Sequence, residues 1–384
     1  MRECHNIEKM HFIIALTMIK YCSDERDLYA KARHICEASR LIKIRIPNRS
    51  EHRKALREAA QLAAQSGARP TALYYFQHSF DLLQDSPWDG SLPDVDHFET
   101  AQLHIETAEM VWSQGQSKEA LRLLSEFLKN ISTAPCRSKA WILKSKIHAQ
   151  AGNHHDAMDS LLTSLEELGV HLREPILFDK CDAAYDQLKA YVKTVNFEAE
   201  MLRPISQDSN VIAIGNVVAE AVAVSFWGDS LTFLRMVIEM INIHLFKGGF
   251  TQIGISCSLL AMVSLSRYKD DELGSRMSDL SSLLHDYSGN SATRATILTL
   301  QHTFVSHMRS PLRSTLPALE SSLEAWSGKG DPHMILLSLS AMACTRLFLG
   351  QDMSELEAFC TDIPEEVNNW MDDARVGVMP VAVK

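Results

Sequence analysis

Three glycines in this chain are each followed, five residues later, by an alanine: Gly67 with Ala72, Gly115 with Ala120, and Gly152 with Ala157. A glycine can take the left-handed conformation that ends a helix, and a small residue five positions later lets the next helix pack closely against the first. Gly249 and Gly254 repeat the offset with a second glycine in place of the alanine. The second and third copies lie 37 residues apart, which is within the range of helical-repeat arrays. The pattern predicts an all-α fold, an α-solenoid of antiparallel helical hairpins.

Apolar residues at helical spacing flank two of these glycines. Ala101, Ile105, Ala108 and Trp112 precede Gly115, and Ala120, Leu124, Phe127 and Ile131 follow it; Ala140, Leu143, Ile147 and Ala151 precede Gly152, and Ala157, Leu161, Leu165 and Leu168 follow it. Ser117 is expected to cap the helix after Gly115, and Gly169 to end the helix after Gly152. Neither half of a hairpin can bury its apolar stripe alone, so we expect consecutive hairpins to stack.

Turn-forming residues divide the chain into segments. Loops are expected at Ser86–Asp96 and Arg203–Asn210, and Leu41–Pro47 is interpreted as a bent helix end or linker because Pro47 disfavours a strand. We predict a helical lead-in at 1–58, tetratricopeptide-like hairpins at 59–203, a second helical-repeat block at 204–370 and an irregular tail at 371–384. In the second block, helices are expected at 211–226, 230–247, 251–268, 271–287, 291–308, 312–326, 332–349 and 353–370.

The charge balance bears on the class of partner. Lys and Arg total 38 against 48 Asp and Glu, which argues against a general binder of nucleic acid or anionic membranes. The stretch Lys31–Arg57 is the exception, with nine Lys or Arg against two Glu. No aromatic residues interleave these charges, so a solvated helix face or a contact with an acidic neighbouring domain is favoured over nucleic acid.

Cysteine usage and hydropathy indicate a cytoplasmic protein. The eight cysteines are scattered and lack zinc-site spacing, which is typical of buried thiols in a reducing compartment. Phe12–Met18 is too short to span a bilayer and is interpreted as part of an amphipathic helix. Val211–Trp227 is the best candidate for a membrane span, but Glu220 in its middle favours a buried helix.

Several blocks of sequence resemble a known family in order and spacing. They are Ser66–Phe76 (SGARPTALYYF), Asp85–Val95, Glu99–Gly115 (ETAQLHIETAEMVWSQG), Trp141–Asn153 (WILKSKIHAQAGN), Leu231–Gly254, Pro311–Trp326 and Gly330–Ser338. Together they resemble the tetratricopeptide-like region of large fungal hybrid histidine kinases, over roughly residues 28 to 370. That family carries a Ser/Thr-kinase-like domain, an AAA-type ATPase domain, this helical region, a GAF domain, a histidine-kinase core and a receiver. The resemblance implies a helical region whose partners are proteins or neighbouring kinase and ATPase domains.

Motifs for catalysis are missing from the sequence. Gly328-Lys329-Gly330 lacks the upstream glycine and the hydroxyl residue of a phosphate-binding loop, and no kinase, zinc-protease or nucleophile-elbow motif occurs. We therefore predict a protein that is not an enzyme, with no catalytic residue, cofactor, metal or small-molecule substrate.

His307 lies in a segment that is similar to a catalytic motif but lacks one of its residues. Phe304–Leu312 (FVSHMRSPL) is similar to the phospho-acceptor box of histidine kinases, but Met308 stands where the box has an acidic residue. Phosphoryl transfer needs that carboxylate to orient the imidazole, and its loss turns the following residues about 100° around a helix. We expect His307 not to be a phospho-acceptor.

Four other groups have structural interpretations. His154-His155 is expected in a solvated turn, and Asp270-Asp271-Glu272 and Met371-Asp372-Asp373 at exposed helix ends. Met236, Met240, Met262 and Met277 are interpreted as core, with an adaptable binding groove as the alternative.

Three functions from different classes remain open. The chain is a signal-transmitting or scaffolding arm of a signalling kinase, a freestanding adaptor that binds a peptide or protein, or, least favoured, a histidine phospho-acceptor. For the arm, we expect Arg45, Arg49 and Arg53 to dock an acidic surface of the preceding ATPase module.

Overall fold

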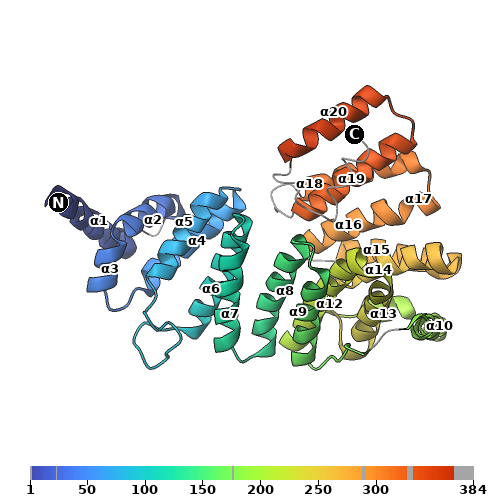
Figure 1. Cartoon of the computed structure of the whole chain (residues 1–384), viewed down its shortest axis with the longest axis horizontal. Coiled ribbons are helices and arrows are strands. Elements are labelled where there is room, and N and C mark those ends of the chain that lie inside the picture. The colour runs from blue at the N-terminus through green and yellow to red at the C-terminus, as the bar shows by residue number, and fades with distance from the viewer. Residues whose placement is uncertain (1, 23, 175–176, 288–290, 327–331, 367–384) are drawn as a thin grey trace. The chain divides into compact units, whose positions relative to one another are not determined.

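The fold is a series of helical hairpins, seen in a computed structural model that describes residues 2–22, 24–174, 177–287, 291–326 and 332–366 (Figure 1). Over these residues there is no β-strand, and a single isolated bridge pairs Ile205 with Gly249. The all-α solenoid predicted from the glycine spacing is confirmed. The chain divides into two compact units, residues 1–140 and 141–384.

The first unit is built from α-helices, with a long loop between α5 and α6. Its elements are α1 (Arg2–Tyr21), η1 (Glu25–Asp27), α2 (Leu28–Glu37), α3 (Ser39–Arg45), α4 (Ser50–Gln65), α5 (Arg69–Asp81), α6 (His97–Ser113) and α7 (Ser117–Asn130), and α8 (Ala134–Gln150) crosses the division. Each helix packs on its neighbours along the chain: α1 on α2, α2 on α4, α4 on α5, α5 on α6, and α6 on α7. The core of this unit is rich in alanine, which permits close helix packing.

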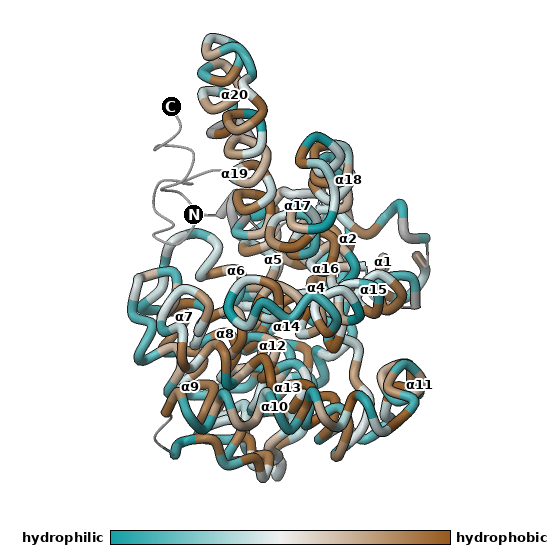
Figure 2. The backbone as a smooth tube through the Cα atoms, turned by 90° about the vertical axis from the view of Figure 1, so that its right-hand side faces the viewer, coloured by the Kyte–Doolittle hydropathy of each residue, from teal (hydrophilic) through white to brown (hydrophobic). Residues whose placement is uncertain are grey.

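The second unit continues the pairing and contains the most apolar helices of the chain, α12 and α14. Its elements are α9 (His154–Glu167), α10 (Phe178–Thr194), α11 (Phe197–Met201), α12 (Ser209–Gly228), α13 (Ser230–Lys247), α14 (Ile253–Val263), the π-turn η2 (Ser264–Tyr268), α15 (Asp271–Tyr287), α16 (Ser291–Phe304), α17 (Ser306–Arg309), η3 (Leu312–Ser314), α18 (Thr315–Trp326), α19 (Pro332–Phe348) and α20 (Met353–Glu366). Within this unit α12 packs on both α9 and α13, and α14 packs on both α15 and α16. Apolar and polar stretches alternate along the helices (Figure 2).

The hairpin glycines behave as their spacing predicts. Gly67, Gly115 and Gly152 have φ values of +80°, +77° and +79°, and Gly169 has +78°. The alanines that follow the first three, Ala72, Ala120 and Ala157, are fully buried. A left-handed glycine thus ends one helix, and a small buried residue in the next helix lets the two helices pack closely where they cross.

The fourth glycine of the series departs from this pattern. Gly249 is not left-handed; its neighbour Gly248 has φ +142° instead. A Cβ atom at Gly249 would lie 2.6 Å from the carbonyl oxygen of Pro204, and the amide of Ser206 donates to the Gly249 carbonyl at 2.8 Å. Gly249 is therefore required by close contact between two backbone segments. Gly254 does lie at a crossing, where an added Cβ would be 2.5 Å from Ile297.

Some helix ends and faces differ from expectation. Ser117 is the first residue of α7, and the preceding Gln116 makes no side-chain cap. The buried face of α6 is centred on Leu103, His104, Thr107, Ala108 and Val111, so only one residue of the expected stripe is fully buried. The helix expected at 291–308 is broken at Val305. This residue has a ψ of −47° but a φ of −121°, which is outside the range of an α-helix.

Domain boundaries predicted after residues 58 and 203 stay predictions. The loop at Ser86–Asp96 lies between helices as expected, and Leu41–Pro47 contains the end of α3. The loop expected at Arg203–Asn210 ends earlier, because Ser209 begins α12. Four segments singled out in the sequence fall outside the described residues. They are the tail at 371–384, the acidic group Met371-Asp372-Asp373, the end of the helix expected at 353–370, and Gly328-Lys329-Gly330.

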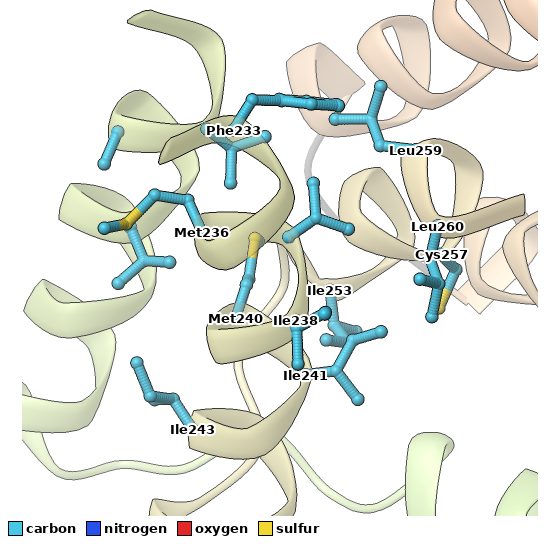
Figure 3. Packing of buried hydrophobic residues seen from close by; sticks show 14 of the residues in the cluster. Phe233, Met236, Ile238, Met240, Ile241, Ile243, Ile253, Cys257, Leu259 and Leu260 are labelled. Atoms are coloured by element: carbon cyan, nitrogen blue, oxygen red, sulfur yellow. The ribbon is translucent and has the colours of Figure 1, made fainter. Parts of the chain in front are cut away.

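The methionine-rich segment belongs to the core of the second unit. Met236, Met240 and Met277 are at most 1% exposed, and Met262 packs against the same cluster. Figure 3 shows Met236 and Met240 on α13 near buried residues of α14 such as Ile253. The core interpretation is confirmed, so these side chains do not line an open groove.

Candidate interaction surfaces

The basic stretch Lys31–Arg57 is largely neutralised within the first unit. Arg53 is 1% exposed, and its guanidinium lies 2.8 Å from Asp94 and 2.7 Å from Glu99. Arg57 pairs with Glu106 at 2.6 Å. These bonds tie α4 to α6 and to the loop that precedes it.

Arg49 belongs to the same buried cluster. It is 3% exposed, and both its backbone amide and its Nε donate to the Asp94 carboxylate, at 3.0 and 3.1 Å. Asp94 has a left-handed φ of +66°, which is uncommon for a residue with a side chain. Burial favours the neutral acid, but the bonds from Arg53 and Arg49 outweigh it and lower the pKa of Asp94.

The predicted docking role of Arg49 and Arg53 is therefore wrong. Both side chains are buried in ion pairs and cannot reach another module without breaking them. Arg45 remains exposed, with its guanidinium 5.9 Å from the ring centre of Phe12. The acidic residues between 94 and 106 could have indicated that these arginines have partners within the chain. The sequence alone does not say which arginine faces which carboxylate.

The outer face of α1 is apolar and exposed. Ile7, Met10, Ile13 and Tyr21 are 53%, 52%, 64% and 70% exposed. On the opposite side of the helix, Ala15 is fully buried in the core of the first unit. The sequence predicted an amphipathic helix here but not a second apolar face. The three-residue spacing of Ile7, Met10 and Ile13 is the sequence pattern that indicates this second face.

Helix α1 is fastened to α2 and α3 by polar contacts as well. The Nδ1 atoms of His11 and His34 lie 2.8 Å apart, and Arg40 of α3 forms a bidentate ion pair with Glu8. These contacts fix which face of α1 points inward.

A polar cluster holds α10 against the π-turn of the second unit. The rings of Tyr185 and Tyr268 stack at 3.7 Å, Tyr185 donates to Asp270 at 3.3 Å, and Lys189 lies 2.6 Å from Asp270. Burial raises the pKa of Tyr268 to about 12, and its hydroxyl donates to Asp182 at 2.6 Å. Asp270 is 9% exposed, so the expected exposed end applies only to the residues after it.

A small cavity of about 150 Å³ lies between α10 and α13. Cys181 and Ile238 form its apolar part, and Lys180, Arg235 and Glu239 supply charges of both signs. The Nη1 of Arg235 already donates to the carbonyl of Glu174, at 2.9 Å.

His307 is exposed on the short helix α17. Arg309 of the same helix forms an ion pair with Asp279, at 2.9 Å. The Ser306 hydroxyl contacts His302 instead, at 2.9 Å. That His307 is not phosphorylated stays a prediction.

The pair His154-His155 begins α9 and does not lie in the turn before it. His155 is exposed and 3.5 Å from Asp156, whereas His154 is only partly exposed and its Nδ1 is buried, so the expectation of solvated side chains holds for His155 alone. In the part of the chain that the structure describes, no three His, Cys, Asp or Glu side chains are grouped to hold a metal ion.

One described helix, α12, has the length and hydropathy needed to cross a membrane. More than half of its apolar window, 56%, is buried inside the structure, and Glu220 lies 3.8 Å from Lys146. The burial favours a core helix, as predicted from Glu220.

Comparison with known proteins yields distant structural matches. Neither a protein-family model nor a curated protein matches the chain. One similar solved structure is a signal transduction ATPase with numerous domains and a tetratricopeptide repeat sensor from Pyrococcus horikoshii: TM-score 0.42, 10% identity, 98% of this chain and 49% of that one. Another is yeast Tom70, with a TM-score of 0.34 and 9% identity over 100% of this chain and 92% of that one. The chain spans about half the length of the first protein, and scores at this level define no family.

Proposed function

We propose that this chain is a non-catalytic helical arm of a multidomain signalling kinase, which holds or relays contacts between neighbouring protein modules. The observation that carries the proposal is that the resembling sequence blocks coincide with the hairpins. Glu99–Gly115 covers α6 and its turn glycine, Trp141–Asn153 covers most of α8 and its turn glycine, and Leu231–Gly254 covers most of α13 and the start of α14. The resemblance to the helical region of fungal hybrid histidine kinases therefore concerns the residues that build the repeat.

A stack of hairpins suits this role physically. Each hairpin contacts mainly its sequence neighbours, so the array presents surface along its length for protein contacts. Seven of the eight cysteines are reduced thiols, which supports the proposed cytoplasmic location; they are Cys22, Cys36, Cys136, Cys181, Cys257, Cys344 and Cys360.

Sequencing the full transcript that encodes this chain tests the proposal. An arm requires a reading frame that encodes a phosphate-binding loop upstream and a histidine-kinase core downstream. A transcript that encodes this chain alone would contradict the arm and leave the freestanding adaptor.

A second test uses the full-length kinase that such a transcript would encode. We expect deletion of the helical region to leave an active isolated kinase core but to uncouple it from the upstream modules. Unchanged regulation in the deletion protein would also contradict the role.

A further inference from the structure

We propose that the outer face of α1 is a docking surface for an amphipathic helix of another protein segment that carries acidic residues along one edge. This inference deepens the proposed function, on which it rests, because it states the chemistry of one partner. The surface consists of Ile7, Met10, Ile13, Thr17 and Tyr21, which are all exposed.

The first argument is the distribution of apolar residues around α1. The inward face packs on α2 and α3 through Ala15, with Phe12 and Ile19 beside it. The outward face exposes Ile13 and Met10 at more than half of their areas. A helix that is apolar on both sides is normally covered on both sides. The described residues of the first unit leave this face uncovered.

The second argument is a pair of lysines that border the face. Lys9 and Lys20 are both exposed. They are 11 residues apart, close to three helical turns, so they lie on the same edge of α1 about 16 Å apart. A partner helix that packs on the apolar face therefore meets two positive charges on one side, and carboxylates three turns apart on that side complement them.

The lysine edge also argues against a second copy of this chain as the occupant. In an antiparallel two-fold pair, the symmetry axis places the Lys9–Lys20 edge of one α1 beside the same edge of the other, so like charges meet. In a parallel pair, the lysines meet the opposite edge, which is formed by Ile7, Ile14 and Met18. Neither arrangement pairs the lysines with carboxylates.

A lipid surface fits the face less well than a helix does. Two lysines contribute only weak attraction to anionic lipid, the chain as a whole carries a net charge of −10, and the face has a single aromatic residue, Tyr21. Membrane binding is accordingly an outcome that would contradict the proposal.

The test uses two designed 21-residue amphipathic peptides as probes. Both have the same leucine face; one has Glu and the other has Lys along one edge. Fluorescence anisotropy with the full chain should show at least tenfold tighter binding of the Glu peptide at low salt, with the difference shrinking as salt rises. Equal affinity for both peptides, or no binding of the Glu peptide, would overturn the proposal.

Three variants of the full chain identify the surface. Ile13→Asp should weaken binding of the Glu peptide at least tenfold, whereas Phe98→Asp, a control with an equally exposed side chain on α6, should not. Lys9→Glu combined with Lys20→Glu should reverse the preference toward the Lys peptide. Because all these side chains are exposed, each variant should keep the circular dichroism spectrum of the parent chain. Unchanged affinity in Ile13→Asp, or unchanged preference in the double variant, would contradict the assignment.

Two further measurements cover the other occupants. Dimerisation in sedimentation that Ile13→Asp abolishes would replace the partner helix by a second copy. Binding to phosphatidylserine vesicles that the Glu peptide cannot compete away would replace it by a membrane. Either result would leave the kinase-arm proposal intact, because that proposal is tested by the transcript.

Discussion

At the scale of single residues, buried charges distinguish this chain from a simple helical array. Arg53 has Asp94 and Glu99 as partners, and Asp94 is shared with Arg49. Removal of Arg53 leaves Asp94 with Arg49 alone and Glu99 without the guanidinium that it binds, which costs more than the intact pairs contribute.

Arg53→Met tests this at nearly constant side-chain length. We expect a loss of about 3–5 kcal/mol in the free energy of unfolding, because buried Asp94 loses one of its two arginine partners and Glu99 loses Arg53. Chemical denaturation followed by circular dichroism measures it. Arg45→Met, on an exposed side chain, is the matched control and should change stability by less than about 0.5 kcal/mol. A loss below about 1 kcal/mol in Arg53→Met would show that the buried ion pairs of Arg53 contribute little to the stability of the fold.

His244 is a second buried titratable group with a definite consequence. Its Nε2 donates to the Met201 carbonyl at 3.2 Å, and burial, with Arg203 nearby, lowers its pKa to about 4. The unfolded chain then binds more protons than the folded chain between pH 4 and the ordinary histidine pKa of about 6.5. Stability contributed by neutral His244 is therefore complete above about pH 6.5 and is lost as the pH falls toward 4.

We expect His244→Gln to flatten this pH dependence. Between pH 7 and pH 4, the parent chain should lose up to about 3 kcal/mol more than the variant in free energy of unfolding. His155→Gln, at an exposed site, should keep the parent slope. Parallel pH profiles for the parent and His244→Gln would contradict the assignment.

At the scale of elements, the hairpin turn is the unit that the structure repeats. Local sequence specifies it, because only glycine adopts the φ of about +80° without strain. The crossing behind the turn is set by packing, since Ala157 has no exposed surface. The π-turn after α14 and the break at Val305 are different, because neither uses a glycine: left-handed Lys269 ends the π-turn, and Val305 has a φ of −121°.

Ala157→Leu tests the crossing between α8 and α9. We expect a loss of about 1–3 kcal/mol through overpacking, measured by chemical denaturation. His155→Leu, two residues earlier and 95% exposed, is the control and should be nearly neutral. Equal stability of the two variants would mean that α9 does not pack closely at this residue.

At the scale of the whole chain, repeated hairpins supply surface for contacts along their length. We expect the purified chain neither to bind nor to hydrolyse ATP, because the sequence contains no phosphate-cradling loop. Isothermal titration calorimetry with MgATP checks this. Saturable binding at micromolar concentration would contradict both the non-catalytic prediction and the kinase-arm proposal in its present form.

The sequence alone predicted what depends on local chemistry. The left-handed turns at Gly67, Gly115 and Gly152 follow from residue type and spacing, and the buried alanines follow from the same pattern. The core position of Met236 follows from helical periodicity. These features require only interactions within a few turns of helix, so the sequence order carries them.

Only the tertiary structure decided which residues meet across long distances in the chain. Arg49 and Arg53 look like free surface cations in the sequence, yet each bonds to a carboxylate more than 40 residues away. Gly249 shares the spacing of the hairpin glycines, but its role comes from the backbone at Pro204. The exposure of Ile13 likewise depends on which face of α1 packs inward. Such pairings are set by the path of the chain in space, because many charges and apolar faces of similar kind compete for the same partners.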